Sequence, residues 1–261
     1  MDEVRRVIVV MLENEDAGIA LQQPFLGELA RRGAYLANYH ALTHPSQPNY
    51  IGLTAGSVYG ITTDGVVTID VPHIGDLIEA ADLDWRVYAE DYPGNCFLGS
   101  FAGSASSGQY LRRHVPFLDY LNIQNDTARC KTHIVDATQF DADVAAQSLP
   151  AFSMYIPNTH NDGHDTDVAT ADRWLQGRFA TLLADSAFME GTLFVVVFDE
   201  GTFSGPNVVY CVLVGAGVRP GTVSQQWYNH YDLLRTFEAL LRLGTLHHHD
   251  EVAIQIRDIW R

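Results

Sequence analysis

Two short, wholly apolar segments, one near the start of the chain and one about three quarters of the way along it, constrain its fold more than any other feature. Residues 7–12 read Val-Ile-Val-Val-Met-Leu and residues 193–198 read Leu-Phe-Val-Val-Val-Phe. Strands of this composition are buried on both faces, which is typical of parallel sheets covered by helices. Between the two segments, apolar residues recur at helical spacing in several places. The pattern predicts an α/β fold with a doubly wound, largely parallel central sheet and helices on both faces.

The composition predicts one domain, residues 1–261, because 47% of the residues are hydrophobic and no segment resembles a linker. Residues 91–135 are rich in Gly, Ser, Asn and Pro, and we expect an irregular insert there, at the mouth of the site. The expected strands are residues 7–12, 34–39, 85–88, 151–156, 193–198 and 208–214. The expected helices are residues 23–32, 49–55, 74–81, 137–147, 169–185 and 231–243.

The charge of the chain restricts its partners. A net charge of −16 argues against binding to nucleic acid or to anionic lipid head groups. No apolar run approaches the roughly 20 residues of a membrane-spanning helix, so we expect no integral membrane segment. Small anionic substrates stay compatible with the charge, because a bound cation reverses the local field. The sequence names no partner protein.

The chain begins without a signal peptide, which favours the cytoplasm, whereas a secreted or periplasmic location would follow if a leader had been removed. Three cysteines do not form a disulfide framework. Cys211 lies in an apolar run and reads as core. Cys96 and Cys130 lie in loop-like segments and could pair in an oxidising compartment.

Each of the two apolar runs ends in a pair of oxygen-donor side chains. Glu13 and Asn14 follow the first run, and Asp199 and Glu200 follow the second. In open α/β sheets, ligands bind beyond the carboxyl ends of the strands. Oxygen donors suit a hard cation such as Mg²⁺, Ca²⁺ or Mn²⁺. The alternative is that these charges are simply solvated, but the pairs favour a metal site.

A turn bracketed by two prolines carries a candidate nucleophile, Ser46, in the segment His44-Pro45-Ser46-Gln47-Pro48-Asn49-Tyr50. A serine hydroxyl becomes nucleophilic when a metal or a base removes its proton. The helix expected after the turn offers free N–H groups to an anion, and Asn49 could donate to a phosphate oxygen. Alternatively, Ser46 is an ordinary helix N-cap.

A polar loop follows the strand expected at residues 151–156. It contains Asn158, Asp162 and His164, which could bind a second ion or contact phosphate, with a histidine as proton donor. A loop that hydrogen-bonds to itself is an equally good interpretation. His230 precedes the last long helix and attracts interest only because several strand ends meet at the same edge.

Seven segments, in this order and along nearly the whole chain, resemble the metal-dependent phosphoesterase family that includes bacterial acid phosphatases of the phospholipase C type, within the alkaline phosphatase superfamily. They are Glu13-Asn14, residues 44–51, residues 85–93, Arg113-His114-Val115-Pro116-Phe117, residues 157–165, Phe198-Asp199-Glu200-Gly201 and residues 229–236.

The resemblance implies an alkaline-phosphatase-like sheet and a serine that is transiently phosphorylated. It implies that Ser46 attacks phosphorus, that Asn49 holds a phosphoryl oxygen, and that the metal is ligated by Glu13, Asn14, Ser46, Asp199 and Glu200. It places His44, Asn158, Asp162, His164 and His230 on the opposite wall. Relatives elsewhere in the superfamily use two zinc ions, whereas the ligand types here leave the metal open between Mg, Ca, Mn and Zn.

We therefore expect metal-dependent hydrolysis of small phosphate monoesters, with His164 or His230 protonating the leaving group. The alternative is a phosphodiesterase, or a phospholipase C-type or lipid-phosphate hydrolase, on the same core. A sulfatase is disfavoured because its signature around the nucleophile differs. A non-catalytic binding protein would be expected to lack Ser46 or a ligand, and a mutase would need a cap domain.

Overall fold

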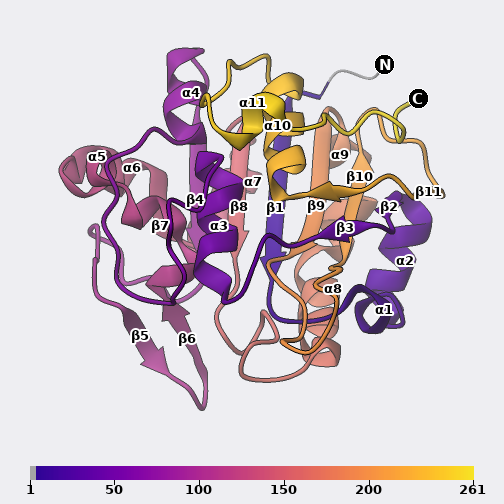
Figure 1. Cartoon of the computed structure of the whole chain (residues 1–261), viewed down its shortest axis with the longest axis horizontal. Coiled ribbons are helices and arrows are strands. Elements are labelled where there is room, and N and C mark those ends of the chain that lie inside the picture. The colour runs from indigo at the N-terminus through magenta and orange to yellow at the C-terminus, as the bar shows by residue number, and fades with distance from the viewer. Residues whose placement is uncertain (1–3) are drawn as a thin grey trace.

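The computed structural model describes residues 4–261 and is built on an eight-stranded sheet with the order β11-β2-β10-β9-β1-β8-β4-β7 (Figure 1). The strands are β1 (Arg6–Leu12), β2 (Ala34–Leu36), β4 (Trp85–Ala89), β7 (Ile134–Asp136), β8 (Phe152–Ile156), β9 (Thr192–Phe198), β10 (Cys211–Gly215) and β11 (Thr222–Ser224). β10 runs antiparallel to β9 and β2, and the other neighbours pair in parallel. The predicted doubly wound, largely parallel sheet is confirmed.

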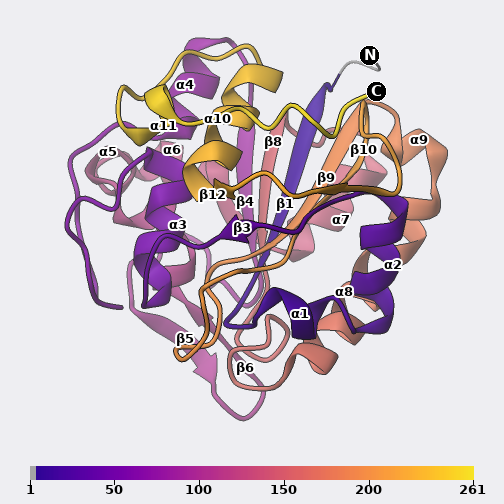
Figure 2. The same ribbon diagram turned by 45° about the vertical axis from the view of Figure 1, so that its right-hand side comes forward.

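Helices cover both faces of this sheet (Figures 1 and 2). On one face lie α2 (Pro24–Arg32), α7 (Thr138–Ala145) and α8 (Val168–Ala184), and on the other lie α3 (Ser46–Ala55) and α10 (His230–Leu240). The Asp172 carboxylate of α8 accepts the first free N–H groups of α2, from Phe25 and Leu26. The remaining short elements are α1 (Ala17–Ala20), α4 (Ile74–Ala80), α9 (Ser186–Met189), α11 (His249–Val252) and the pair β3 (Tyr39–His40) and β12 (Tyr228–Asn229).

The register of the two central strands sets the position of the site. β1 and β9 are fully buried from Val7 onward, as their apolar composition predicts. They pair in parallel with Leu12 opposite Phe198, and the Asp199 N–H extends the ladder by donating to the Leu12 carbonyl at 3.0 Å. Both strands therefore end at the same level of the sheet, and the polar pairs that follow them start side by side.

Helix α3 begins at Ser46, earlier than the predicted start at residue 49. Pro48 lies in its first turn, where backbone N–H groups have no partner within the helix, so proline is tolerated there. The helix ends as predicted at Gly56, whose φ of 71° is left-handed and suits glycine. Its residues are buried throughout, which fixes Ser46 rigidly.

Residues 91–135, which were expected to be irregular, contain short regular elements from residue 101 onward. They form hairpin β5 (Phe101–Ser104) and β6 (Gly108–Leu111), the 3₁₀ turns η1 (Arg112–His114) and η2 (Pro116–Asp119), and helices α5 (Leu121–Gln124) and α6 (Thr127–His133). These elements are too short for a periodic pattern to reveal them.

A disulfide joins Cys96 and Cys130, the pair left open by the sequence, and ties the start of the insert to α6. Hairpin β5–β6 projects beyond the lower edge of the sheet in Figure 1, the edge where β1 ends. The insert therefore stands beside the carboxyl ends of the strands. Over residues 4–261, no helix has the length and apolar character needed to cross a bilayer.

Candidate active site

The strand-end side chains converge on the hydroxyl of Ser46. This hydroxyl lies 2.9 Å from Glu13 Oε2, 3.2 Å from Glu200 Oε1 and 3.3 Å from Asn14 Oδ1. Asp199 joins them because its Oδ1 accepts the Asn14 N–H at 3.1 Å. The structure thus brings together all five residues that the sequence selected as a ligand set.

The carboxylates of this cluster repel one another in a buried position. Burial, followed by the charge of Asp199, raises the pKa of Glu13 well above its usual range. Burial and then the charge of Glu200 do the same to the pKa of Asp199. Asp199 Oδ2 is buried without a hydrogen-bond partner in residues 4–261. Buried carboxylates need a proton or a cation as a counterion, and an all-oxygen set fits a hard divalent cation.

Tyr50 supports the cluster from helix α3, which also carries Ser46. It lies one turn after Ser46, on the same face of α3, and its hydroxyl donates to Glu13 Oε1. The Gln47 N–H, the next donor at this helix end, is taken by Asp64 Oδ1 at 3.0 Å. The start of α3 is thus held on one side by the strand-end carboxylate and on the other by the loop of Asp64.

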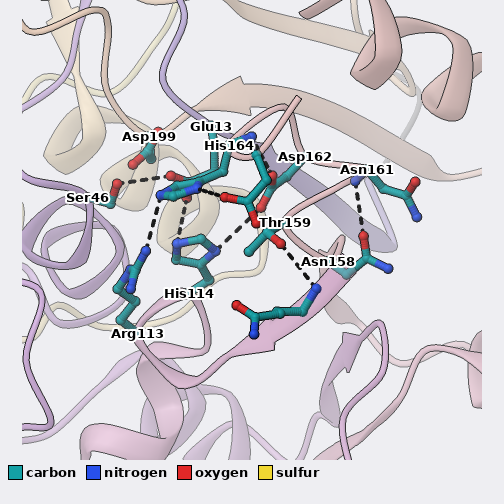
Figure 3. A network of polar contacts seen from close by, with 12 residues as sticks. Glu13, Ser46, Arg113, His114, Asn158, Thr159, Asn161, Asp162, His164 and Asp199 are labelled. Atoms are coloured by element: carbon teal, nitrogen blue, oxygen red, sulfur yellow. Dashed lines mark hydrogen bonds and ion pairs between the residues drawn. The ribbon is translucent and has the colours of Figure 1, made fainter. Parts of the chain in front are cut away.

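His114 brings the insert into the site (Figure 3). It is buried, stacks on the Tyr50 ring at a centroid distance of 5.3 Å, and lies between two carboxylates. Its Nε2 is 3.4 Å from Glu13 Oε1 and its Nδ1 is 3.5 Å from Asp162 Oδ2. Ligand atoms of these three residues lie within 4.8 Å of one another, so Glu13, His114 and Asp162 could hold a metal ion.

The protonation states of His114 and Asp162 also favour a cation among Glu13, His114 and Asp162. Burial, then the charge of Arg113, lowers the pKa of His114 well below its usual value, so the imidazole is neutral and carries one N–H. Burial raises the pKa of Asp162 to about 8. The neutral ring of His114 lies between two carboxylates but has only one N–H, so its other nitrogen presents a lone pair to a carboxylate oxygen, and the two repel each other. His114 Nε2 and Asp162 Oδ2 are both buried without a hydrogen-bond partner among the described residues. A proton or a metal ion between them removes this repulsion.

His164 lies next to this group, with its ring centroid 5.9 Å from that of His114. Its Nδ1 contacts Asp165 Oδ1 at 2.7 Å, and its Nε2 contacts Arg113 Nη2 at 3.1 Å. An arginine only donates hydrogen bonds, so Nε2 is the acceptor and Nδ1 carries the proton. Asp162 holds the segment in place by accepting the His164 N–H at 2.8 Å.

Other predicted residues lie near the site but have different contacts. The Asn49 amide donates to the carbonyls of Thr43 and Pro45 and accepts the N–H groups of Leu42 and Thr43. Both of its donor hydrogens are used, so in this structure Asn49 shapes the loop before Ser46 and is not free for the predicted phosphoryl contact.

His230 is buried behind the site. Its Nε2 bonds to the Asp199 carbonyl at 2.7 Å and its Nδ1 to the Tyr39 hydroxyl at 2.8 Å, while burial lowers its pKa to about 4. A neutral ring with both nitrogens in use supports the Asp199 backbone. This arrangement speaks against the predicted role of His230 as a proton donor.

The two remaining predicted residues, His44 and Asn158, lie in different places, and only His44 faces the site. The imidazole of His44 faces the site, with Nδ1 2.6 Å from Glu200 Oε2. Asn158 lies away from Ser46, at the far side of the network in Figure 3, and donates to Asp91 at 2.6 Å. Its Oδ1 accepts N–H groups of its own loop, from His160 and Asn161, so Asn158 matches the interpretation of a self-bonded loop.

Sequence reasoning gave no role to Tyr50, Arg113 and His114. The position of Tyr50, four residues after Ser46 in a helix, is a signal that could have identified it. Arg113 and His114 stood out only as one of the segments of the resemblance. Their place beside Glu13 depends on the path of the insert, which local sequence patterns do not encode.

Comparisons with known proteins identify the family of this chain. A family model described as the phosphoesterase family matches residues 20–244. A phosphatidylinositol-3-phosphatase from Mycobacterium tuberculosis is 35% identical over 259 residues, which cover 97% of this chain and 82% of that protein. A phosphate-repressible acid phosphatase from Penicillium chrysogenum is 33% identical over 247 residues, which cover 92% of this chain and 60% of that protein. This chain thus spans about three fifths of the length of the fungal phosphatase.

Solved structures share the fold at low identity. A protein of the alkaline phosphatase superfamily from Vibrio parahaemolyticus superposes with a TM-score of 0.66 at 13% identity, covering 98% of this chain and 71% of that one. A phosphonate monoester hydrolase from Silicibacter pomeroyi gives 0.61 at 11% identity, covering 98% and 78%. The family model and the two relatives go further than the fold: the chain belongs to the phosphoesterase family.

Proposed function

We propose that this chain hydrolyses phosphate monoesters, with Ser46 as nucleophile beside a divalent metal ion. The observation that carries the proposal is the position of the Ser46 hydroxyl, which is within 3.3 Å of Glu13, Asn14 and Glu200 at the end of two buried strands. Relatives named acid phosphatase and phosphatidylinositol-3-phosphatase support the reaction class.

The strand-end set of Glu13, Asn14, Asp199 and Glu200 would hold the ion next to Ser46. Oxygen ligands favour Mg²⁺, Ca²⁺ or Mn²⁺, whereas His114 adds the nitrogen donor that Zn²⁺ often takes. A bound ion would lower the pKa of the serine hydroxyl and offset the charge of the phosphate. Glu13 belongs both to this strand-end set and to the group that it forms with His114 and Asp162. It would therefore couple the two groups.

The protein's own residues account for the proton and bond changes. The Ser46 hydroxyl donates to Glu13 at 2.9 Å, so an acceptor for its proton is in place. Ser46 Oγ forms a bond to phosphorus while the bond from phosphorus to the alcohol oxygen breaks. His164, in its protonated form, gives a proton to the leaving oxygen. Water then attacks phosphorus while the bond from phosphorus to Ser46 Oγ breaks. His164, now neutral, takes a proton from the water, Glu13 returns its proton to Ser46 Oγ, and inorganic phosphate is released.

His164 is assigned as the acid because of where the histidines lie. His230 has both nitrogens engaged behind the site, and His44 faces Glu200. His164 is half-buried, and its Nε2 is held by the long side chain of Arg113, which can turn to a phosphate oxygen instead.

A substrate screen tests the proposal. Aryl phosphate monoesters and diesters are offered to the protein with Mg²⁺, Mn²⁺, Ca²⁺ or Zn²⁺, and we expect metal-dependent release of phosphate from the monoesters. Ser46→Ala should abolish it, whereas Ser153→Ala, which changes a buried serine of β8, should retain it. Near-normal turnover in Ser46→Ala, or full activity in excess chelator, would contradict the proposal.

A lipid phosphate is the second candidate substrate. It is favoured by the relative named phosphatidylinositol-3-phosphatase, of which this chain covers 82%. The same screen separates the two when a dispersed phosphatidylinositol phosphate is included. A specificity constant far above that of the aryl phosphates would identify a lipid-phosphate hydrolase.

A further inference from the structure

An exposed phenylalanine lies beside the proposed catalytic centre. Phe203 is 82% exposed and follows Glu200 closely in the chain. Its ring centroid is 4.8 Å from that of His44, whose Nδ1 contacts Glu200 Oε2 at 2.6 Å. Glu200 Oε1 in turn lies 3.2 Å from Ser46 Oγ. Two side chains therefore connect an apolar, solvent-facing ring to the nucleophile.

The loop that carries Phe203 is tied down next to the ring. Asp16 accepts the Thr202 N–H at 3.0 Å and the Thr202 hydroxyl at 2.8 Å. A Cβ added at Gly201 or Gly205 would lie 2.5 or 2.7 Å from Asp16 Oδ1, so only glycine lets the loop close around this carboxylate. The loop holds Phe203 outward over the site instead of leaving it free to fold into the core.

The ring also differs in character from the rest of the site. The side chains around Ser46 are carboxylates, amides and imidazoles, which suit a metal ion and a phosphate but offer nothing to an apolar alcohol. A phenyl ring that is 82% exposed forgoes most of the stabilisation that its burial would give. A substrate whose apolar part covers the ring recovers that stabilisation on binding.

We infer that Phe203 is a specificity-determining residue that contacts the apolar alcohol portion of the substrate. The inference rests on the proposed function and narrows its substrate class to phosphate monoesters of alkyl-chain or aryl alcohols. Phosphate binds at Ser46, and the alcohol extends past His44 onto the Phe203 ring.

The chain offers a matched control for this residue. Trp227 is also an exposed aromatic residue, at 48%, and its ring also lies against a histidine, His40, with a centroid distance of 5.4 Å. His40 contacts Asn38 and none of the strand-end carboxylates, so Trp227→Ala removes a similar feature away from the proposed site.

The test uses n-alkyl phosphates from ethyl to octyl with the metal-loaded protein, because leaving-group basicity is nearly constant along this series. The wild type should show a kcat/KM that rises with chain length. Phe203→Ala should lower kcat/KM about 10-fold for octyl phosphate and less than about 2-fold for ethyl phosphate. Phe203→Leu should keep most of the preference, and Trp227→Ala should match the wild type.

A binding experiment separates recognition from turnover. Titration calorimetry with alkyl phosphonates, which are not hydrolysed as esters, should show octylphosphonate losing affinity in Phe203→Ala while ethylphosphonate does not. Equal losses at every chain length, or none at any, would overturn the inference and leave the proposed function standing. No hydrolysis of any monoester by the wild type would overturn both.

Discussion

The candidate site has two halves, one formed by the strand ends and one by the insert, and they meet at the Glu13 carboxylate. Glu13 and Asp199 follow strands that pair in register along their whole length, so the sheet itself sets their positions. Arg113 and His114 come from a short 3₁₀ turn in an insert held by a hairpin, small helices and a disulfide. The positions of the strand-end residues are fixed by the regular pairing of the sheet. The positions of Arg113 and His114 depend on the tertiary packing of the insert.

This difference has a chemical counterpart. The strand ends supply oxygen donors and a proton acceptor for the proposed nucleophile, Ser46. The insert supplies nitrogen groups, of which His114 faces Glu13 and Arg113 contacts His164. We therefore expect the strand ends to determine metal affinity and bond formation, and the insert to orient the phosphate. Variants in the two halves should then differ in both size and kind of effect.

The largest effect is expected from Asp199→Asn. The substitution keeps the shape but removes one negative charge, and outer-shell changes alone weaken metal sites by about 10–100-fold. Metal affinity should fall at least about 100-fold, with turnover restored in part by excess metal. Affinity is measured by calorimetry, and unchanged affinity would show that Asp199 does not contribute to a metal site.

Metal binding should also change the pH dependence of stability. An unfolded carboxyl group titrates near about 4, whereas burial raises the pKa of Asp162 to about 8 and that of Glu13 above its usual range. A folded group with a raised pKa holds a proton that the unfolded group has lost. Its contribution to the free energy of unfolding is therefore present below about pH 4 and lost as the pH rises towards 8.

The metal-free protein should accordingly lose stability between pH 5 and pH 8, and a divalent ion should restore it. A metal concentration of about 100 Kd at pH 8 gives a gain of about 2.7 kcal/mol there, and the same concentration should give a smaller gain at pH 5, where protons compete with the metal for the carboxylates. Denaturant unfolding with metal or with chelator at both pH values measures this. If the metal raised the free energy of unfolding of Asp199→Asn as much as that of the wild type, the stabilisation would not depend on the strand-end residues.

A smaller effect is expected from His114→Asn in the insert. The amide keeps a polar group between Glu13 and Asp162 but shortens the side chain, so kcat/KM should fall about 10-fold with the strand-end metal retained. Metal stoichiometry and kinetics on aryl phosphates check this together. A loss of metal as complete as in Asp199→Asn would mean that the insert holds the ion jointly with the strand ends.

The same contrast explains how much could be predicted from the sequence. Long apolar runs reveal buried strands, and parallel strands bring their carboxyl ends together, so Glu13, Asn14, Asp199 and Glu200 followed from pattern alone. Strand direction is not encoded in a short apolar run, which is why the antiparallel course of β10 was not predicted.

Residue type was a weaker guide than position. Asn49 and His230 are suitable for phosphate chemistry, yet the structure uses all their hydrogen-bonding atoms to hold the loop before Ser46 and the Asp199 backbone. His114 was given no role, because its contact with Glu13 joins segments about a hundred positions apart through the path of the insert. Long-range placement of short elements depends on tertiary packing.

The central claim is that Ser46 attacks phosphorus among the strand-end carboxylates, and trapping the covalent intermediate tests it most directly. Metal-loaded protein is mixed with an aryl phosphate monoester, quenched in acid and mapped by peptide mass spectrometry, with Ser153→Ala as a positive control and Ser46→Ala as a blank. The account predicts phosphate on Ser46 alone in the wild type and in Ser153→Ala, and none in Ser46→Ala. Phosphate on another residue, together with continued turnover by Ser46→Ala, would contradict it.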